Sequence, residues 1–112
     1  MGKAKIKAII KRPDEKYGHM TNISNTLKNL QRTVEGYIET VTYSDCPCTE
    51  SGNLVVICNE EGRIRNLPFN CRLGMDFHGT IIVCEAQKDE FTDLTMSFKA
   101  WRHMLDANNF SL

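Results

Sequence analysis

The stretch that decides the fold is Leu54-Val-Val-Ile-Cys-Asn-Glu-Glu-Gly-Arg-Ile-Arg-Asn-Leu-Pro-Phe-Asn70. Its first five residues, Leu54–Cys58, form a continuous apolar run that is typical of a central β-strand. The next four, Asn59–Gly62, fit a type I turn with a left-handed glycine. Arg63–Arg65 predicts a short returning strand, and Leu67–Asn70 a second turn fixed by its proline. The stretch therefore predicts a buried strand that ends in an exposed polar loop.

Hydrophobic periodicity places the other elements. Ala4–Ile10 alternates apolar residues with lysine, Tyr37–Tyr43 is rich in β-branched and aromatic residues, and Thr80–Glu85 is apolar, so all three predict strands. A helix is expected from Ile23 to Gly36 and another from Thr95 to Asn108, because apolar residues recur there at helical spacing.

Capping residues set the expected helix ends. Ser24 or Asn25 can cap the first helix, Gly36 can end it in a left-handed conformation, and Thr95 or Asp93 can cap the second helix. Residues 12–22 and 44–53 are expected to be connections, and residues 66–76 to be irregular.

Together these elements predict an α+β fold in the order β-α-β-β-β-β-α. We expect a mostly antiparallel sheet of four to five strands with two helices on one face. With 112 residues, the whole of 1–112 forms a single domain.

Charge and hydropathy restrict the class of protein. Lys+Arg and Asp+Glu both number 14, and a net charge of zero argues against duplex DNA as the main partner. The first twelve residues nevertheless hold five basic residues and no acid, which leaves a local basic face open, although a strand edge protected by lysines is the preferred interpretation. No signal peptide or membrane span is evident, so we expect a cytoplasmic protein with no membrane contact.

Five cysteines are present, and an odd number without a signal peptide argues against a disulfide scaffold. Cys58 and Cys84 lie in apolar runs and should be buried. Cys46-Pro47-Cys48 lies in a loop, and a zinc site formed by these two with Cys71 and His78 would not have the usual paired spacing. We therefore expect reduced cysteines, no metal and no cofactor.

The exposed polar loop supplies the candidate binding site. Glu60 and Glu61 are neighbours in a turn, so their carboxylates diverge and do not suit paired acid–base catalysis. A carboxylate can bind ribose hydroxyls, arginines can bind phosphates, the amide of Asn70 can read a base edge, and an aromatic ring can stack on a base. The same residue types also suit a protein interface, and a plain exposed hairpin tip is a further alternative. The candidate residues are Tyr37, Asn59, Glu60, Glu61, Arg63, Arg65, Phe69 and Asn70.

Several segments follow one another in a recognisable order: Ile23–Thr42, a helix followed by Val34–Glu39, then Cys58–Gly62, Leu67–Asn70, Gly79–Val83 and Phe91–Thr95. In this order they resemble a family of small proteins of unknown function carried by phages, plasmids and other bacterial mobile elements. The resemblance implies a mobile-element context, in which small proteins without catalytic signatures often counter host defences.

Two functions follow as expectations. The first is a non-catalytic counter-defence protein that sequesters a signalling nucleotide or inhibits a defence protein such as a CRISPR nuclease. The alternative is an accessory nucleic-acid-binding or regulatory factor for maintenance of the element. We also expect a homodimer or higher homo-oligomer, because Tyr37, Val41 and Tyr43 share one apolar face of a predicted strand beside Glu39.

Overall fold

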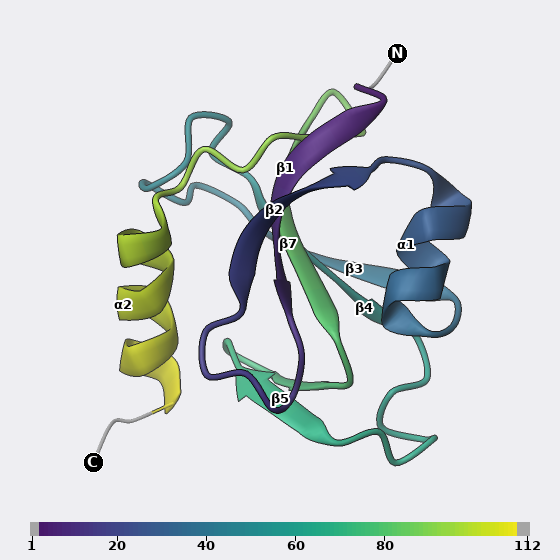
Figure 1. Ribbon diagram of the computed structural model, residues 1–112. Coiled ribbons are helices and arrows are strands. Elements are labelled where there is room, and N and C mark those ends of the chain that lie inside the picture. Colours follow the sequence, from purple (N-terminus) through teal and green to yellow (C-terminus); the bar gives the residue numbers. More distant parts are fainter. Residues whose placement is uncertain (1–2, 110–112) are drawn as a thin grey trace.

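The computed structural model describes residues 3–109 and shows an antiparallel six-stranded sheet with a helix on each side (Figure 1). The elements are β1 (Lys5–Lys11), β2 (His19–Ser24), α1 (Leu27–Val34), β3 (Ile38–Tyr43), β4 (Leu54–Asn59), β5 (Phe69–Arg72), β6 (Asp76–His78), β7 (Ile81–Gln87), β8 (Glu90–Thr92) and α2 (Phe98–Asn109). The strand order is β2-β1-β7-β4-β3, and β8 pairs with β7 beside this path. A separate hairpin, β5–β6, forms the second sheet. The predicted α+β class is confirmed.

The core lies on both faces of the sheet, because β4 and the first five residues of β7 are buried throughout. On one face, Leu30 and Val34 of α1 pack with Val55 and Ile82. The opposite face meets α2 and the β5–β6 hairpin, with Trp101 at the centre of its cluster. Figure 1 shows α1 and α2 on opposite sides of the sheet. The expectation of two helices on one face is wrong, since a central strand that is apolar on both faces needs cover on both.

The predicted first helix merges two elements. Ile23 belongs to β2, where it pairs with Ile6 of β1, so the predicted connection over residues 12–22 contains part of a strand. α1 begins later, with Thr26 as its N-cap accepting a hydrogen bond from the Asn29 N–H at 3.2 Å. Glu35, with φ of 64°, takes the left-handed position expected for Gly36. Ile23 carries the same apolar signal in a strand as it would in a helix.

The start of α2 also differs from the prediction. The Ser97 hydroxyl accepts a hydrogen bond from the Ala100 N–H at 3.1 Å, so it caps the helix in place of Thr95 or Asp93. Asp93 instead accepts a hydrogen bond from the Lys7 N–H at 2.8 Å and forms an ion pair with Lys3. Part of the basic N-terminal cluster is therefore neutralised within the fold.

β1 is an interior strand, which corrects the interpretation of its lysines as protection for an edge. It pairs with β2 on one side and β7 on the other. Lys5 and Lys7 are exposed, but Lys11 is only 3% exposed. It lies at the end of β1, where its side chain hydrogen-bonds to Asn70 of β5. The edge strands of the main path are β2 and β3.

The face proposed for oligomerisation is largely covered within the chain. Val41 and Tyr43 of β3 pack against the α2-side core, and the Tyr43 hydroxyl donates a hydrogen bond to the Leu73 carbonyl. Tyr37 alone of the three is exposed. The homo-oligomer therefore stays a prediction, and the exposed apolar surface that supports it is smaller than the sequence suggested.

All five cysteines are free thiols. Burial raises the pKa of Cys58 and of Cys71 to about 11, and that of Cys84 to about 12, so these three side chains act as small apolar groups. Over residues 3–109 no group of three or more His, Cys, Asp or Glu side chains is arranged to hold a metal ion. Within the same range no helix is long and apolar enough to cross a membrane.

Candidate functional site

The polar segment after β4 is a compact helical turn rather than a returning strand. The Gly62 N–H donates to the Asn59 carbonyl at 3.2 Å, and the Arg65 N–H donates to the Glu61 carbonyl at 2.8 Å. Asn66, with φ of 55°, ends the turn in the left-handed conformation that was expected for Gly62. We refer to residues 60–66 as the 60–66 turn. The predicted strand Arg63–Arg65 is wrong because local hydrogen bonds of helical type satisfy its backbone.

Asn59 and Arg65 attach this turn to the end of α1. The buried Asn59 amide donates to the carbonyls of Val34 at 3.0 Å and Glu35 at 3.2 Å, and its oxygen accepts from the Glu61 N–H at 2.8 Å. The Arg65 guanidinium donates to the same Glu35 carbonyl at 2.9 Å. The carbonyls at the end of a helix lack intrahelical partners, and Asn59 supplies them. Its side chain is therefore structural and is not free for a ligand.

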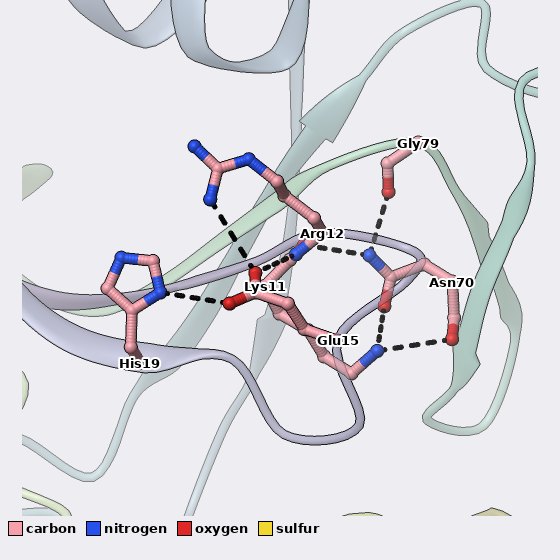
Figure 2. A network of polar contacts seen from close by, with 6 residues as sticks. All are labelled: Lys11, Arg12, Glu15, His19, Asn70 and Gly79. Carbon is pink, nitrogen blue, oxygen red and sulfur yellow. Dashed lines mark hydrogen bonds and ion pairs between the residues drawn. The ribbon is translucent and has the colours of Figure 1, made fainter.

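Asn70 is likewise a structural residue, in contrast to its predicted role of reading a base edge. Its amide nitrogen donates to the carbonyls of Lys11 and Gly79, both at 2.8 Å, and its oxygen accepts from Lys11 Nζ at 2.8 Å. Figure 2 shows these contacts joining the end of β1, the β5 strand and the approach to β7. With 7% of its surface exposed, Asn70 fixes three segments together.

The remaining candidate residues form an exposed surface around the 60–66 turn. Among residues 3–109 there are five exposed large hydrophobic residues, and four of them gather here. Ile64 and Met75 line one groove of about 200 Å³ together with Glu60 and Arg63. Two contacts place the others beside it. We define the turn surface as Tyr37, Glu60, Glu61, Arg63, Ile64, Phe69 and Met75.

Tyr37 is held beside the turn by a backbone hydrogen bond, and Phe69 is held beside the groove by a contact between two rings. The Glu60 N–H donates to the Tyr37 carbonyl at 2.8 Å, which holds Tyr37 next to the turn. The Phe69 ring meets the His78 ring edge-on, with centroids 5.7 Å apart, and His78 also lines the groove. Ile64 is 82% exposed and Tyr37 is 69% exposed. Large apolar side chains that are exposed close to charged ones are typical of an interaction site.

The sequence predicted most residues of the turn surface as site residues, but it did not predict Ile64 or Met75. It also gave no role to Lys11, which is buried elsewhere in the fold. The sequence placed Ile64 in a strand. Its two neighbours in the chain are arginines, and this lack of adjacent apolar residues could have indicated that Ile64 is exposed. Met75 lies in a segment without periodicity. Lys11 shares a strand face with the buried Ile9 but also with the exposed Lys5 and Lys7, so strand parity gave no signal of its burial.

Gly62 is required by close packing, and this gives a test of the turn. A Cβ at Gly62 would lie 2.7 Å from the His78 carbonyl oxygen. We expect Gly62→Val to lower the free energy of unfolding by about 1–3 kcal/mol, since the backbone of β6 must shift. The exposed neighbour provides the control, with Glu61→Val expected to change stability by no more than about 0.5 kcal/mol. Urea denaturation measures both, and equal losses would show that the contact with His78 is not the cause.

The fold and this surface define a small antiparallel α+β domain with a mixed polar and apolar turn exposed at one end. Residues 6–106 match the family model described as "Domain of unknown function (DUF3846)", and the chain belongs to this family. The resemblance to an uncharacterised family is thereby confirmed. Comparison with curated proteins and with solved structures gave no match.

Proposed function

We propose that this protein acts by binding a protein partner through the turn surface, without catalysis. The observation that supports the proposal is the gathering of Tyr37, Ile64, Phe69 and Met75 around a turn that also carries exposed charges. Aromatic residues, methionine and arginine are enriched in protein interfaces. A few such side chains usually supply most of the binding energy.

A protein partner suits this surface better than a nucleotide. The groove beside Ile64 has a volume of about 200 Å³, whereas pockets for small molecules usually hold about 300–1,000 Å³. The Asn70 amide, the expected reader of a base, is fully engaged inside the fold. Sequestration of a signalling nucleotide is therefore the weaker form of the proposal and becomes an outcome of its test.

The biological role that we propose is counter-defence for a bacterial mobile element, within the cytoplasm of the host. This step rests on the family resemblance described above and on analogy with small binding proteins of such elements. The alternative role, an accessory nucleic-acid-binding factor, depends on the basic N-terminus. It has less support, because Asp93 pairs with Lys3 and Lys11 is buried.

The test uses a charge placed at the centre of the turn surface. Ile64→Asp is expected to abolish protection of an infecting phage when the protein is expressed in a host that carries a matching defence system. Loss of a central apolar contact typically costs about 2 kcal/mol or more of binding free energy, or roughly thirtyfold in affinity. Plaque counts measure the effect in cells, and titration calorimetry measures it with the purified target.

Leu27→Asp is the matched control, since Leu27 is 59% exposed but begins α1, away from the groove. It should leave both plaque counts and thermal stability unchanged. If Ile64→Asp kept full activity, the turn surface would not be the contact site. If the purified protein consumed a nucleotide, the proposal of binding without chemistry would fail.

A further inference from the structure

A second concave site lies next to the turn surface, at the end of β1. It is a cavity of about 280 Å³ between the β1–β2 connection, β5 and α2. Its buried lining residues are Lys11, Asn70, Cys71 and Leu105, and Pro13 and Phe69 add apolar surface. Glu15 and Lys16 of the β1–β2 connection also line it. The proposed contact with a protein does not use this cavity, although Phe69 borders both sites.

Lys11 is the unusual group in this cavity. Its Nζ donates to the Asn70 side-chain oxygen at 2.8 Å and to the Asn70 backbone carbonyl at 3.3 Å. Both acceptors are neutral, and among residues 3–109 no ion pair involves Lys11. A buried ammonium group without a counter-ion is costly, and such groups are normally paired. Burial accordingly lowers the pKa of Lys11, while the charges of Cys71, Glu15 and Asp14 oppose this shift.

The carboxylate that lines the same cavity is already engaged. Glu15 Oε1 accepts from the Arg12 N–H at 2.8 Å, and Glu15 Oε2 contacts His19 Nδ1 at 3.1 Å. Figure 2 shows Glu15 joined to Arg12 and His19, while Lys11 Nζ is joined to Asn70. An ammonium group has three N–H bonds, and Asn70 offers acceptors for two of them. One N–H donor of Lys11 is thus left for a molecule in the cavity.

We propose that the cavity beside Lys11 and Asn70 binds a small organic monocarboxylate with a compact apolar body. The carboxylate accepts a charge-assisted hydrogen bond from Lys11 Nζ, and the apolar body packs against Phe69, Leu105 and Pro13. The cavity of about 280 Å³ is smaller than a usual pocket for a drug-sized ligand, but it exceeds the roughly 150 Å³ of an apolar cavity that holds benzene, so it suits a ligand of about the size of a substituted benzene ring. Lys16 also lines the cavity but is exposed, so Lys11 is the buried cation that a carboxylate would meet.

Benzoate is the probe, and benzyl alcohol is its uncharged counterpart. Titration calorimetry of the full chain should show saturable benzoate binding. Benzyl alcohol should bind more weakly by a factor of about ten or more, because it lacks the charge. Lys11→Met keeps the length of the side chain and removes the ammonium group, so it should weaken benzoate binding by a similar factor. Lys5→Met, an exposed lysine of the same strand, should bind as the wild type does.

A second measurement keeps the proposal testable if Lys11→Met does not fold. A bound carboxylate favours the charged amine, so benzoate binding should take up protons near the lowered pKa of Lys11, and its affinity should fall as the pH rises through that value. Calorimetry in buffers of different ionisation enthalpy measures this uptake.

Equal binding of benzyl alcohol, no benzoate binding, or no proton uptake would each overturn the proposal. Inorganic phosphate binding in place of benzoate would also overturn it, because the site would then select a different anion. Ile64→Asp should bind benzoate normally, so failure at this cavity and failure of the proposed protein contact are separable.

Discussion

Glu85→Ala is expected to lower the free energy of unfolding by about 3–5 kcal/mol, because it removes a buried charge that several groups are arranged to meet. The Glu85 side chain is fully buried. Its carboxylate accepts from the Ser51 hydroxyl at 2.8 Å and the Thr95 hydroxyl at 2.7 Å, and also from the N–H groups of Ser51, Thr95 and Met96. Removing the carboxylate would leave these donors without a partner. Urea denaturation at pH 7 measures the change in the free energy of unfolding.

The charge of Glu85 also predicts a pH dependence. Desolvation acts to raise the pKa of Glu85, but the hydrogen bonds from Thr95 and Ser51 outweigh it, so the folded pKa lies below the ordinary value. A carboxylate with a depressed folded pKa stabilises the protein above its unfolded pKa, and this contribution is lost as the pH falls through the folded pKa. Glu85→Gln should be less destabilising than Glu85→Ala and should remove this component of the acid transition. An unchanged transition in Glu85→Gln would contradict the assignment.

Asn70→Ala is the second change with a large expected effect, about 2–4 kcal/mol of lost stability. The substitution leaves the carbonyls of Lys11 and Gly79 without their amide donor and deprives Lys11 Nζ of its closer acceptor. The sequence alone suggested that alanine would be nearly neutral at this position, on the assumption that Asn70 is exposed. Its burial reverses that expectation.

Asn22 of β2 gives the control for Asn70, since it is an exposed asparagine in the same fold. Asn22→Ala should change the free energy of unfolding by no more than about 0.5 kcal/mol. Thermal and urea unfolding of both variants measure the difference. If Asn70→Ala were as stable as Asn22→Ala, the three segments would be held by other contacts.

The central strands were predictable from sequence because they are apolar on both faces. Leu54–Cys58 and Thr80–Glu85 stand out as continuous runs, and the structure places both in the middle of the sheet. β2 was not predictable in the same way, since four of the six residues in its sequence His-Met-Thr-Asn-Ile-Ser are polar and it forms an edge. Only its pairing with β1 shows that Ile23 is in a strand. Edge strands carry weak local signals because one side of them faces water.

The sequence predicted where in the chain the candidate site lies, but not which of its polar residues are exposed and which hold the fold together. A turn residue and a capping residue can have the same polar side chain, and periodicity does not distinguish them. Glu60 and Arg63 are exposed as expected, while Asn59 and Asn70 bond to backbone groups of segments distant in sequence. Those bonds arise from tertiary structure. The same reason explains Lys11, which is buried by chain segments that follow it by some sixty positions.

The place of β7 in the sheet has a consequence for how the chain is made. The β1–β2 and β3–β4 hairpins precede β7 in sequence, yet in the sheet they meet only through it. A ribosome therefore releases two separate hairpins, each with an open edge and apolar faces, before residues 81–87 emerge to join them. Contacts between parts so distant in the chain slow folding and prolong exposure of aggregation-prone edges. The nascent domain is thus most vulnerable until β7 has emerged, because β7 completes the core to which β1 and β4 contribute.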